Sequence, residues 1–185
     1  MEFNIDTLKK RTVSMAFSAI IVALMSYYGL RFADVGGGVS QIYPAIAFII
    51  AFGIWFGIWG VIGVYIGAVL GGMMAGYSLE YSALLMIADA VEAAIPALLY
   101  RYTELSPIPY NPSTFLGFLT VSVLITNFLG ACTGILLIGL PLFERSWMAW
   151  FMGNILVSLT LLPVLLVSFS EVIKRVGYIA GRSGV

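Results

Sequence analysis

The chain has 185 residues, of which 61% are hydrophobic and only 10% are charged, and its mean hydropathy is +1.04. Soluble domains carry about 25% charged residues, so this composition predicts an integral membrane protein. The absence of histidine and the single cysteine, Cys132, exclude histidine-based triads, an internal disulfide and a multi-cysteine metal cluster. Nine basic and nine acidic residues leave no net charge that would indicate nucleic acid as a partner.

The apolar segments predict an all-α fold, a single domain with a bundle of six transmembrane helices. A spanning helix needs about 20 residues, and short polar segments divide the chain accordingly. The predicted spans are residues 12–30, 43–55, 57–76, 80–100, 113–140 and 146–168, and residues 169–185 are predicted to form a short cytoplasmic tail.

The second and third spans come from one uncharged stretch, residues 42–76. As a single helix it would be about 52 Å long, whereas the hydrocarbon core of a bilayer is about 30 Å thick. We therefore expect this stretch to break, and the sequence between Gly53 and Gly57 marks the expected position.

The distribution of basic residues predicts the orientation of the spans. With six helices and both termini inside, seven basic residues are cytoplasmic and only Arg31 and Arg145 are outside. If residues 42–76 formed one helix, four would be inside and five outside. Cytoplasmic loops are enriched in Lys and Arg, which favours six helices with both ends inside and the loop from Arg101 to Pro112 in the cytoplasm.

Small residues recur at a spacing of four in the first and third predicted spans, namely at Ala19 and Ala23 and at Gly63, Gly67 and Gly71. This spacing produces a flat helix face that another helix can approach closely. Either the glycine face packs against a neighbouring helix of the same chain, or these five residues form a partner-binding surface.

Two acidic residues, Asp89 and Glu92, lie near the middle of the fourth predicted span. Because they are three residues apart, this carboxyl pair shares one face of the helix. A charge at that depth costs from about 3 kcal/mol upward, and the sequence offers no Lys or Arg at a matching depth. The pair is either protonated and hydrogen-bonded in support of the bundle, or part of a site for a coupled ion or for a cationic or hydrogen-bond-donating ligand.

Other side chains complete the predicted ligand-binding site. Trp150 and Asn154 share one face of the sixth span, where an aromatic ring beside an amide is typical of a pocket lining. Asn127 brings a second amide into the fifth span. Tyr43 lies at the outer end of the second span, where we expect the mouth of the site, although tyrosine at this level also serves as an interface anchor.

The sequence shows no catalytic constellation. Ser82, Ser122 and Thr126 have no basic partner that could activate them as nucleophiles, and the spacing of the carboxyl pair does not by itself define a hydrolase. We therefore expect a protein that is not an enzyme and that holds no cofactor and no metal ion.

Three segments resemble the MASE-type membrane-associated sensor domain. They are Ile42-Tyr43-Pro44-Ala45-Ile46-Ala47 with the glycine-rich helix that follows, Ala88 to Arg101, and Trp147-Met148-Ala149-Trp150-Phe151-Met152-Gly153-Asn154. The family has Trp-Pro-x-x-Gly at the first segment and Trp-x-x-Trp-x-x-Gly-Asp at the third, so that Tyr43 replaces a tryptophan and Asn154 an aspartate. The resemblance implies a ligand sensor that signals through a histidine kinase or a cyclic-dinucleotide enzyme, although the family has more helices than the six predicted here.

The chain also resembles the substrate-binding component of energy-coupling-factor vitamin transporters. Those proteins have six helices with both ends inside and Ala-x-x-x-Ala in the first helix, as at Ala19 and Ala23. This resemblance implies a transmembrane coupling subunit and ATPases as partners. Both resemblances imply a multi-pass cell-membrane protein that contacts lipid, binds a small molecule and acts through a cytoplasmic or membrane partner protein. The Trp-x-x-Trp motif favours the sensor, and a membrane assembly protein without a small ligand is the third alternative.

Overall fold

A computed structural model of the chain describes residues 5–104, 106–107 and 111–175. These residues form helices and connecting loops without a β-strand, which confirms the predicted all-α class. The helices are α1 (Ile5–Phe32), α2 (Ala45–Phe56), α3 (Ile58–Met74), α4 (Leu79–Leu85), α5 (Ile87–Tyr102), α6 (Pro112–Leu137) and α7 (Arg145–Arg175).

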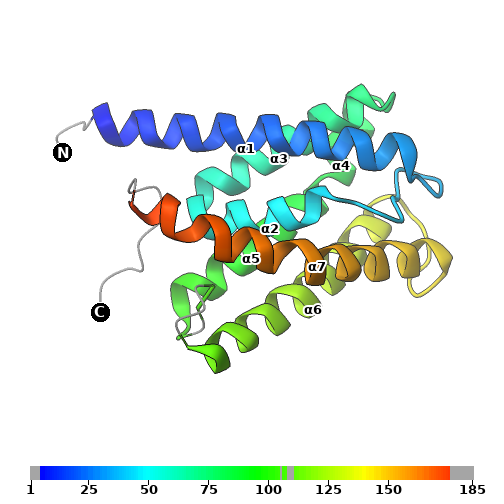
Figure 1. The fold of residues 1–185 in the computed structure, drawn as a ribbon. Helices are drawn as coiled ribbons and strands as arrows, with labels where there is room; N and C mark the ends of the chain where they lie inside the picture. The colour runs from blue at the N-terminus through cyan, green and yellow to red at the C-terminus, as the bar shows by residue number, and fades with distance from the viewer. Residues whose placement is uncertain (1–4, 105, 108–110, 176–185) are drawn as a thin grey trace.

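The helices run alternately along the long axis of the molecule (Figure 1). Helices α1, α3 and α6 run from left to right in Figure 1, and α2, α5 and α7 run back. The start of α1 and the end of α7 therefore lie at the same end. We call it the basic end, because it holds Lys9, Lys10, Arg11, Arg101, Lys174 and Arg175. We call the opposite end, where α1 ends and α7 begins, the loop end; Arg31 and Arg145 lie there.

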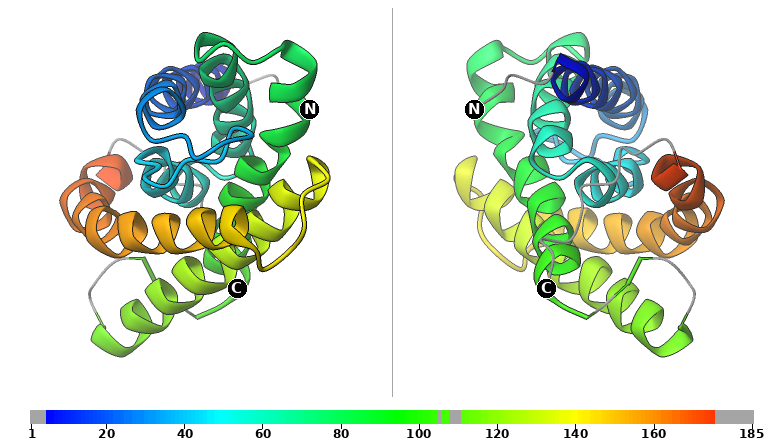
Figure 2. Two further views of the ribbon diagram at one scale, coloured as in Figure 1. Left: turned by 90° about the vertical axis from the view of Figure 1, so that its right-hand side faces the viewer. Right: turned by 90° about the vertical axis from the view of Figure 1, so that its left-hand side faces the viewer.

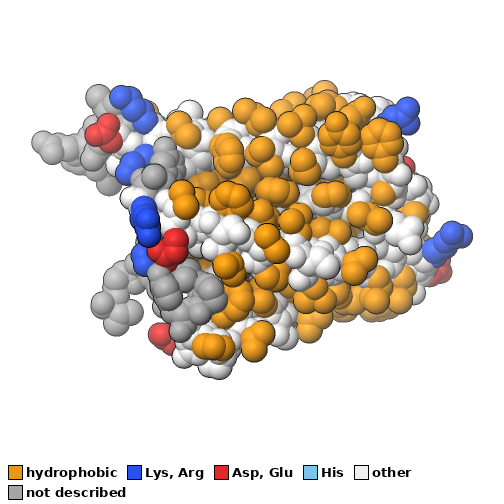
Figure 3. All heavy atoms as spheres, in the orientation of Figure 1, with side chains coloured by type: hydrophobic (Ala, Val, Ile, Leu, Met, Phe, Trp, Pro, Cys, Tyr) orange, Lys and Arg blue, Asp and Glu red, His pale blue; other side chains and the backbone are white. Residues whose placement is uncertain are grey.

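Apolar side chains cover the surface between these two ends, and charged side chains gather at the ends themselves (Figure 3). Four helical segments are long and apolar enough to cross a membrane, namely Asp6–Phe32, Leu79–Tyr102, Pro112–Leu137 and Arg145–Arg175. Helices α2 and α3 are shorter apolar helices. An apolar surface over long apolar helices is compatible with a helical membrane bundle.

The long uncharged stretch is broken between α2 and α3, as its length predicts. The break falls at Gly57, whose φ of 58° is rare for a residue with a side chain. The two helices then pack against each other, and Gly60 makes this possible because a Cβ there would collide with the carbonyl oxygen of Phe52. Gly53 serves another contact, since its missing side chain lets the backbone of Ala93 in α5 approach.

Helix α2 forms the centre of the molecule. It packs against α1, α3, α5 and α7, and every one of its residues except Phe48 is buried. Viewed along the long axis, it lies between α1 and α7 (Figure 2). The indole Nε1 of Trp55, in the last turn of α2, donates a hydrogen bond to Oγ of Ser170 at 2.9 Å.

At two places the structure adds detail to the predicted segments. Residues 169–175, predicted as part of a tail, continue α7, and the bond from Trp55 to Ser170 holds them against α2. The rest of the predicted tail lies outside the described residues. The predicted span 80–100 corresponds to two helices, α4 and α5, which meet at Met86. Ser78 caps α4 by accepting a hydrogen bond from the backbone N–H of Tyr81.

Candidate functional site

The carboxyl pair lies inside the bundle at the start of α5. Asp89 is 1% exposed and Glu92 is fully buried. Within the described part of the chain, no Lys or Arg interacts with either carboxyl group, because the basic residues lie at the two ends of the molecule. A buried carboxyl group requires hydrogen bonds or an opposite charge, so the neighbouring polar groups decide what the pair can do.

A chain of hydrogen bonds joins Asp89 to two other elements. The hydroxyl of Tyr43 donates to Oδ2 of Asp89 at 2.6 Å, and Oγ of Ser26 lies 2.6 Å from the same hydroxyl oxygen. Ser26 belongs to α1, whereas Tyr43 and Pro44 immediately precede the first residue of α2. Tyr43, which the sequence places at the expected mouth of the site, thus bonds directly to one member of the carboxyl pair.

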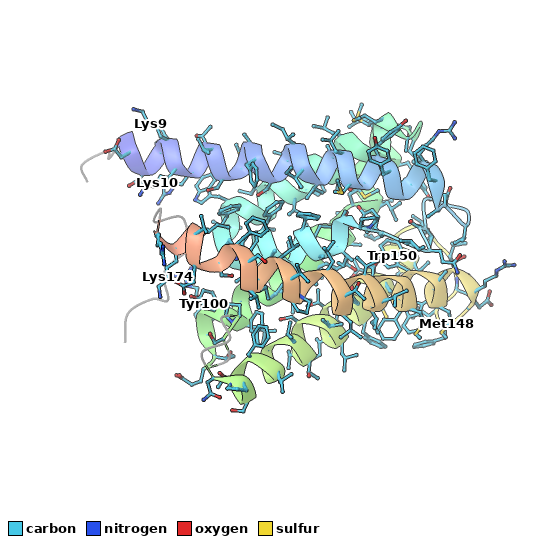
Figure 4. The ribbon with its side chains drawn as sticks, in the orientation of Figure 1. Lys9, Lys10, Tyr100, Met148, Trp150 and Lys174 are labelled. Carbon is cyan, nitrogen blue, oxygen red and sulfur yellow. The ribbon has the colours of Figure 1, made fainter. Side chains whose placement is uncertain are left out.

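Glu92 contacts α6 and α7. Nδ2 of Asn154 donates to Oε1 of Glu92 at 3.1 Å, and the Trp150 indole interacts with the same carboxyl group. The carboxyl group reaches α6 only because Gly130 has no side chain, since a Cβ there would collide with it. The structure therefore brings together five of the six predicted ligand-binding residues: Tyr43, Asp89, Glu92, Trp150 and Asn154 (Figure 4 labels Trp150).

Two acceptor atoms at this site have no hydrogen-bond partner among the described residues, namely Oε2 of Glu92 and Oδ1 of Asn154. A buried acceptor without a donor costs about 1–3 kcal/mol, so the arrangement is suited to a group that donates hydrogen bonds. A small cavity of about 10 Å³, lined by Tyr43, Asp89, Trp150 and Asn154 among others, lies beside them. It is about the size of one water molecule.

The loop between α1 and α2, residues 33–44, closes this site at the loop end. Its Gly38 and Ser40 line the cavity. Two stacked tyrosines hold the loop: the Tyr77 hydroxyl donates to Oδ2 of Asp34 at 2.7 Å, and the Tyr81 hydroxyl donates to the carbonyl oxygen of Gly37 at 2.8 Å. The loop also packs against α7, because a Cβ at Gly153 would collide with the carbonyl oxygen of Gln41.

Asn127 takes part in a different interaction. Its Nδ2 donates to the carbonyl oxygen of Val123 at 2.7 Å and to Oγ of Ser158 at 3.2 Å. Neither bond reaches the carboxyl pair, so the structure separates Asn127 from the other predicted ligand-binding residues. It connects α6 to α7 instead.

The residues predicted as a partner-binding surface face one another inside the chain. Helix α3 lies along α1, and a Cβ at Gly63, Gly67 or Gly71 would collide with the backbone of α1, which includes the carbonyl oxygens of Ala19 and Ala23. This is the first of the two arrangements that the spacing allows. The role of these residues toward a partner remains a prediction, because in this structure the glycine face is occupied by α1.

Three contributors to the site were missed by sequence reasoning: Ser26, Ser40 and Gly130. Gly130 and Gly134 are four residues apart in α6, as the glycines of α3 are, and this spacing is the signal that indicates Gly130. The Trp150 ring packs where a Cβ of Gly134 would lie. Ser26 gave no signal, because serine is common on the interior faces of membrane helices.

Chemically, the site offers two carboxyl groups, a phenol and an amide in apolar surroundings. These groups can hold a proton, a small cation or a hydrogen-bond donor. Comparison of the chain with protein families, with curated proteins and with solved structures finds no match.

Proposed function

We propose that the protein is a multi-pass module of the cell membrane that binds a small cationic or hydrogen-bond-donating ligand at the carboxyl pair and acts through a partner protein, as a sensor does. The observation that carries the proposal is the buried pair itself, Asp89 and Glu92, with no basic partner in the described chain and with Oε2 of Glu92 unbonded there. Ionisable residues inside membranes are costly and mark functional sites by default.

The proposed topology has six membrane spans with both ends in the cytoplasm. It is supported by the alternating helix directions and by the six described Lys and Arg residues at the basic end, against two at the loop end. The loop end then faces the outside, and the ligand enters past residues 33–44.

The size of the cavity limits the ligand that the closed site can hold. Pockets for ligands of drug size have volumes of about 300–1,000 Å³, whereas this cavity has about 10 Å³. A ligand larger than water therefore requires residues 33–44 to move outward, which breaks the bonds from Tyr77 to Asp34 and from Tyr81 to Gly37.

Carbodiimide labelling tests the site. Dicyclohexylcarbodiimide modifies carboxyl groups in apolar surroundings, and mass spectrometry locates the modified residue. We expect labelling at Asp89 or Glu92, slowed by methylammonium or choline, and reduced in D89N and E92Q. The control is E80Q, because Glu80 is an exposed acid in α4. Labelling of the pair that neither cation slows contradicts a cationic ligand and leaves only a neutral hydrogen-bond donor.

A substrate-binding transport component is the second candidate, favoured by helices that alternate with both ends at the basic end. Ala19 and Ala23 face α3, so a coupling subunit would contact the exposed face of α1 at Ile20 and Leu24. The substitution I20W should then disrupt the complex with the coupling subunit, whereas truncation after Ser170 should disrupt a complex with a signalling protein. Net transport into empty vesicles by the purified chain alone would refute dependence on a partner in both cases.

A further inference from the structure

A second and much larger cavity opens at the basic end, and neither member of the carboxyl pair lines it. Its volume is about 790 Å³, and it lies between α1, the turn from α2 to α3, and the end of α5. Its charged lining residues are Lys10, Arg11 and Arg101, and no acidic residue is among the described residues that line it. Figure 4 shows Lys10 and Tyr100, two of the lining residues, at this end of the molecule. We call it the basic cavity.

The arginines of the basic cavity are oriented by aromatic rings. The Arg11 guanidinium lies 5.5 Å from the centre of the Trp59 ring, and that of Arg101 lies 5.5 Å from the centre of the Tyr102 ring. Among the described residues, neither guanidinium is paired with a carboxylate. A guanidinium over a ring keeps its N–H groups in its own plane, and this fork matches a phosphate group.

The other walls of the basic cavity are apolar and reach the lipid-facing surface. Ile54, Phe56 and Ala97 line it from inside. Ile58 and Leu98 also line it, yet they are 63% and 54% exposed, so the cavity opens sideways into the apolar surface of the bundle. It therefore joins a cationic mouth at the end of the molecule to a hydrocarbon-like flank.

We propose that the basic cavity binds an anionic amphiphile, namely a membrane lipid whose phosphate-bearing headgroup lies among Lys10, Arg11 and Arg101 and whose hydrocarbon chain passes Ile58 and Leu98. Basic pockets between transmembrane helices on the cytoplasmic side suit anionic headgroups, and the volume is that of a ligand pocket. The proposal goes beyond the proposed function, since it involves none of the residues of the carboxyl pair. A free phosphate ion shares the headgroup chemistry, and the experiment separates the two.

Quenching of Trp59 by brominated lipids tests the basic cavity. The full chain is placed in nanodiscs, and the Trp59 emission is obtained as the difference between the wild-type protein and W59F. We expect brominated phosphatidylglycerol to bind at least about fivefold more strongly than brominated phosphatidylcholine. Removing one charge should weaken the preference about fivefold, so R101Q should lose it and R101K should keep it.

R101Q is preferred to R11Q, because Arg11 contacts the ring that reports binding. The matched control is R31Q, which removes an arginine at the loop end, and circular dichroism verifies that each variant is folded. Equal quenching by the two lipids in the wild-type protein overturns the lipid site. An equal effect of R101Q and R31Q also overturns it, because the preference would then reflect net charge.

Inorganic phosphate distinguishes the source of the anion. It is added at millimolar concentration against sodium chloride of equal ionic strength. A lipid preference that survives phosphate supports the lipid. Protection of the W59F-sensitive emission by phosphate without any preference between lipids overturns the lipid in favour of a soluble anion.

Discussion

Glu92 joins three helices through a single carboxyl group. It projects from α5, rests on Gly130 of α6 and accepts a hydrogen bond from Asn154 of α7. A change at this position therefore affects the bundle as well as the proposed ligand, and the two effects are separable because the acceptor and the charge can be removed independently.

Substitutions at Glu92 should distinguish its structural role from its charge. E92Q retains an oxygen that accepts from Asn154, so we expect it to unfold near the wild-type midpoint while it loses cation protection. E92L leaves the buried Nδ2 of Asn154 without this acceptor, which costs about 1–3 kcal/mol. Unfolding in detergent, followed by circular dichroism, measures both. E80L at an exposed acid is the control, and an E92L variant as stable as E92Q would show that the bond contributes nothing.

Tyr77 gives the loop of residues 33–44 a dependence on alkaline pH. Burial, followed by the hydrogen bond to Asp34, raises the pKa of Tyr77 from 10.0 to about 12. The stabilising contribution of the neutral hydroxyl is therefore complete below pH 10 and is lost as the pH rises through about 12.

The difference in unfolding midpoint between the wild-type protein and Y77F measures this contribution. We expect it to be constant up to about pH 10 and to shrink toward pH 12. Y28F is the control, because Tyr28 is 53% exposed on α1. A difference that grows with pH would contradict the raised pKa.

At the scale of helices, the contact between α1 and α3 depends on backbone approaching backbone. A Cβ at Gly67 would collide with the backbone carbonyl oxygen of Ala19, and a backbone group cannot turn aside as a side chain can. We expect G67A to destabilise the bundle by about 1–3 kcal/mol and to increase hydrogen exchange in α1.

The control for G67A is I66A, since Ile66 is exposed on the same helix. Unfolding of I66A near the wild-type midpoint shows that the loss belongs to the glycine face. An unchanged unfolding midpoint in G67A would contradict this expectation, because it would show that the close approach of α1 and α3 does not contribute to the stability of the bundle.

Element by element, the sequence predicts what length and spacing can determine. The break at Gly57 follows from a stretch too long for the bilayer, and the shared face of Asp89 and Glu92 follows from helix geometry. The junction of α4 and α5 at Met86 lies in an apolar segment with no Gly or Pro beside it, so the local sequence does not predict this junction.

The spacing of residues in the sequence does not predict contacts between distant elements. The bond from Tyr43 to Asp89 joins residues 46 positions apart, and spacing relates residues only within one helix. For the same reason the sequence placed Asn127 in the site, although the rotation of α6 directs it toward Ser158.

At the scale of the whole molecule, labelling of single cysteines tests the six-span topology. In a protein with Cys132 replaced by serine, a cysteine at Ser106 should react with a membrane-impermeant maleimide only after the cell is opened. A cysteine at Glu144, exposed at the loop end, should react in intact cells. Reaction of Ser106→Cys from outside would mean that the orientation is the reverse of the proposed one. Reaction of both cysteines from the same side of the membrane would mean that α6 does not cross it.

The central helix also has a consequence for biogenesis. Helix α2 has 12 residues, hence a length of about 18 Å, and no side chain caps its first turn. A bilayer cannot satisfy the N–H groups at such an end, so α2 is stable only once α1, α5 and α7 enclose it. Although α2 is synthesised before α5 and α7, it is thus stable in its place only after α7 has been synthesised.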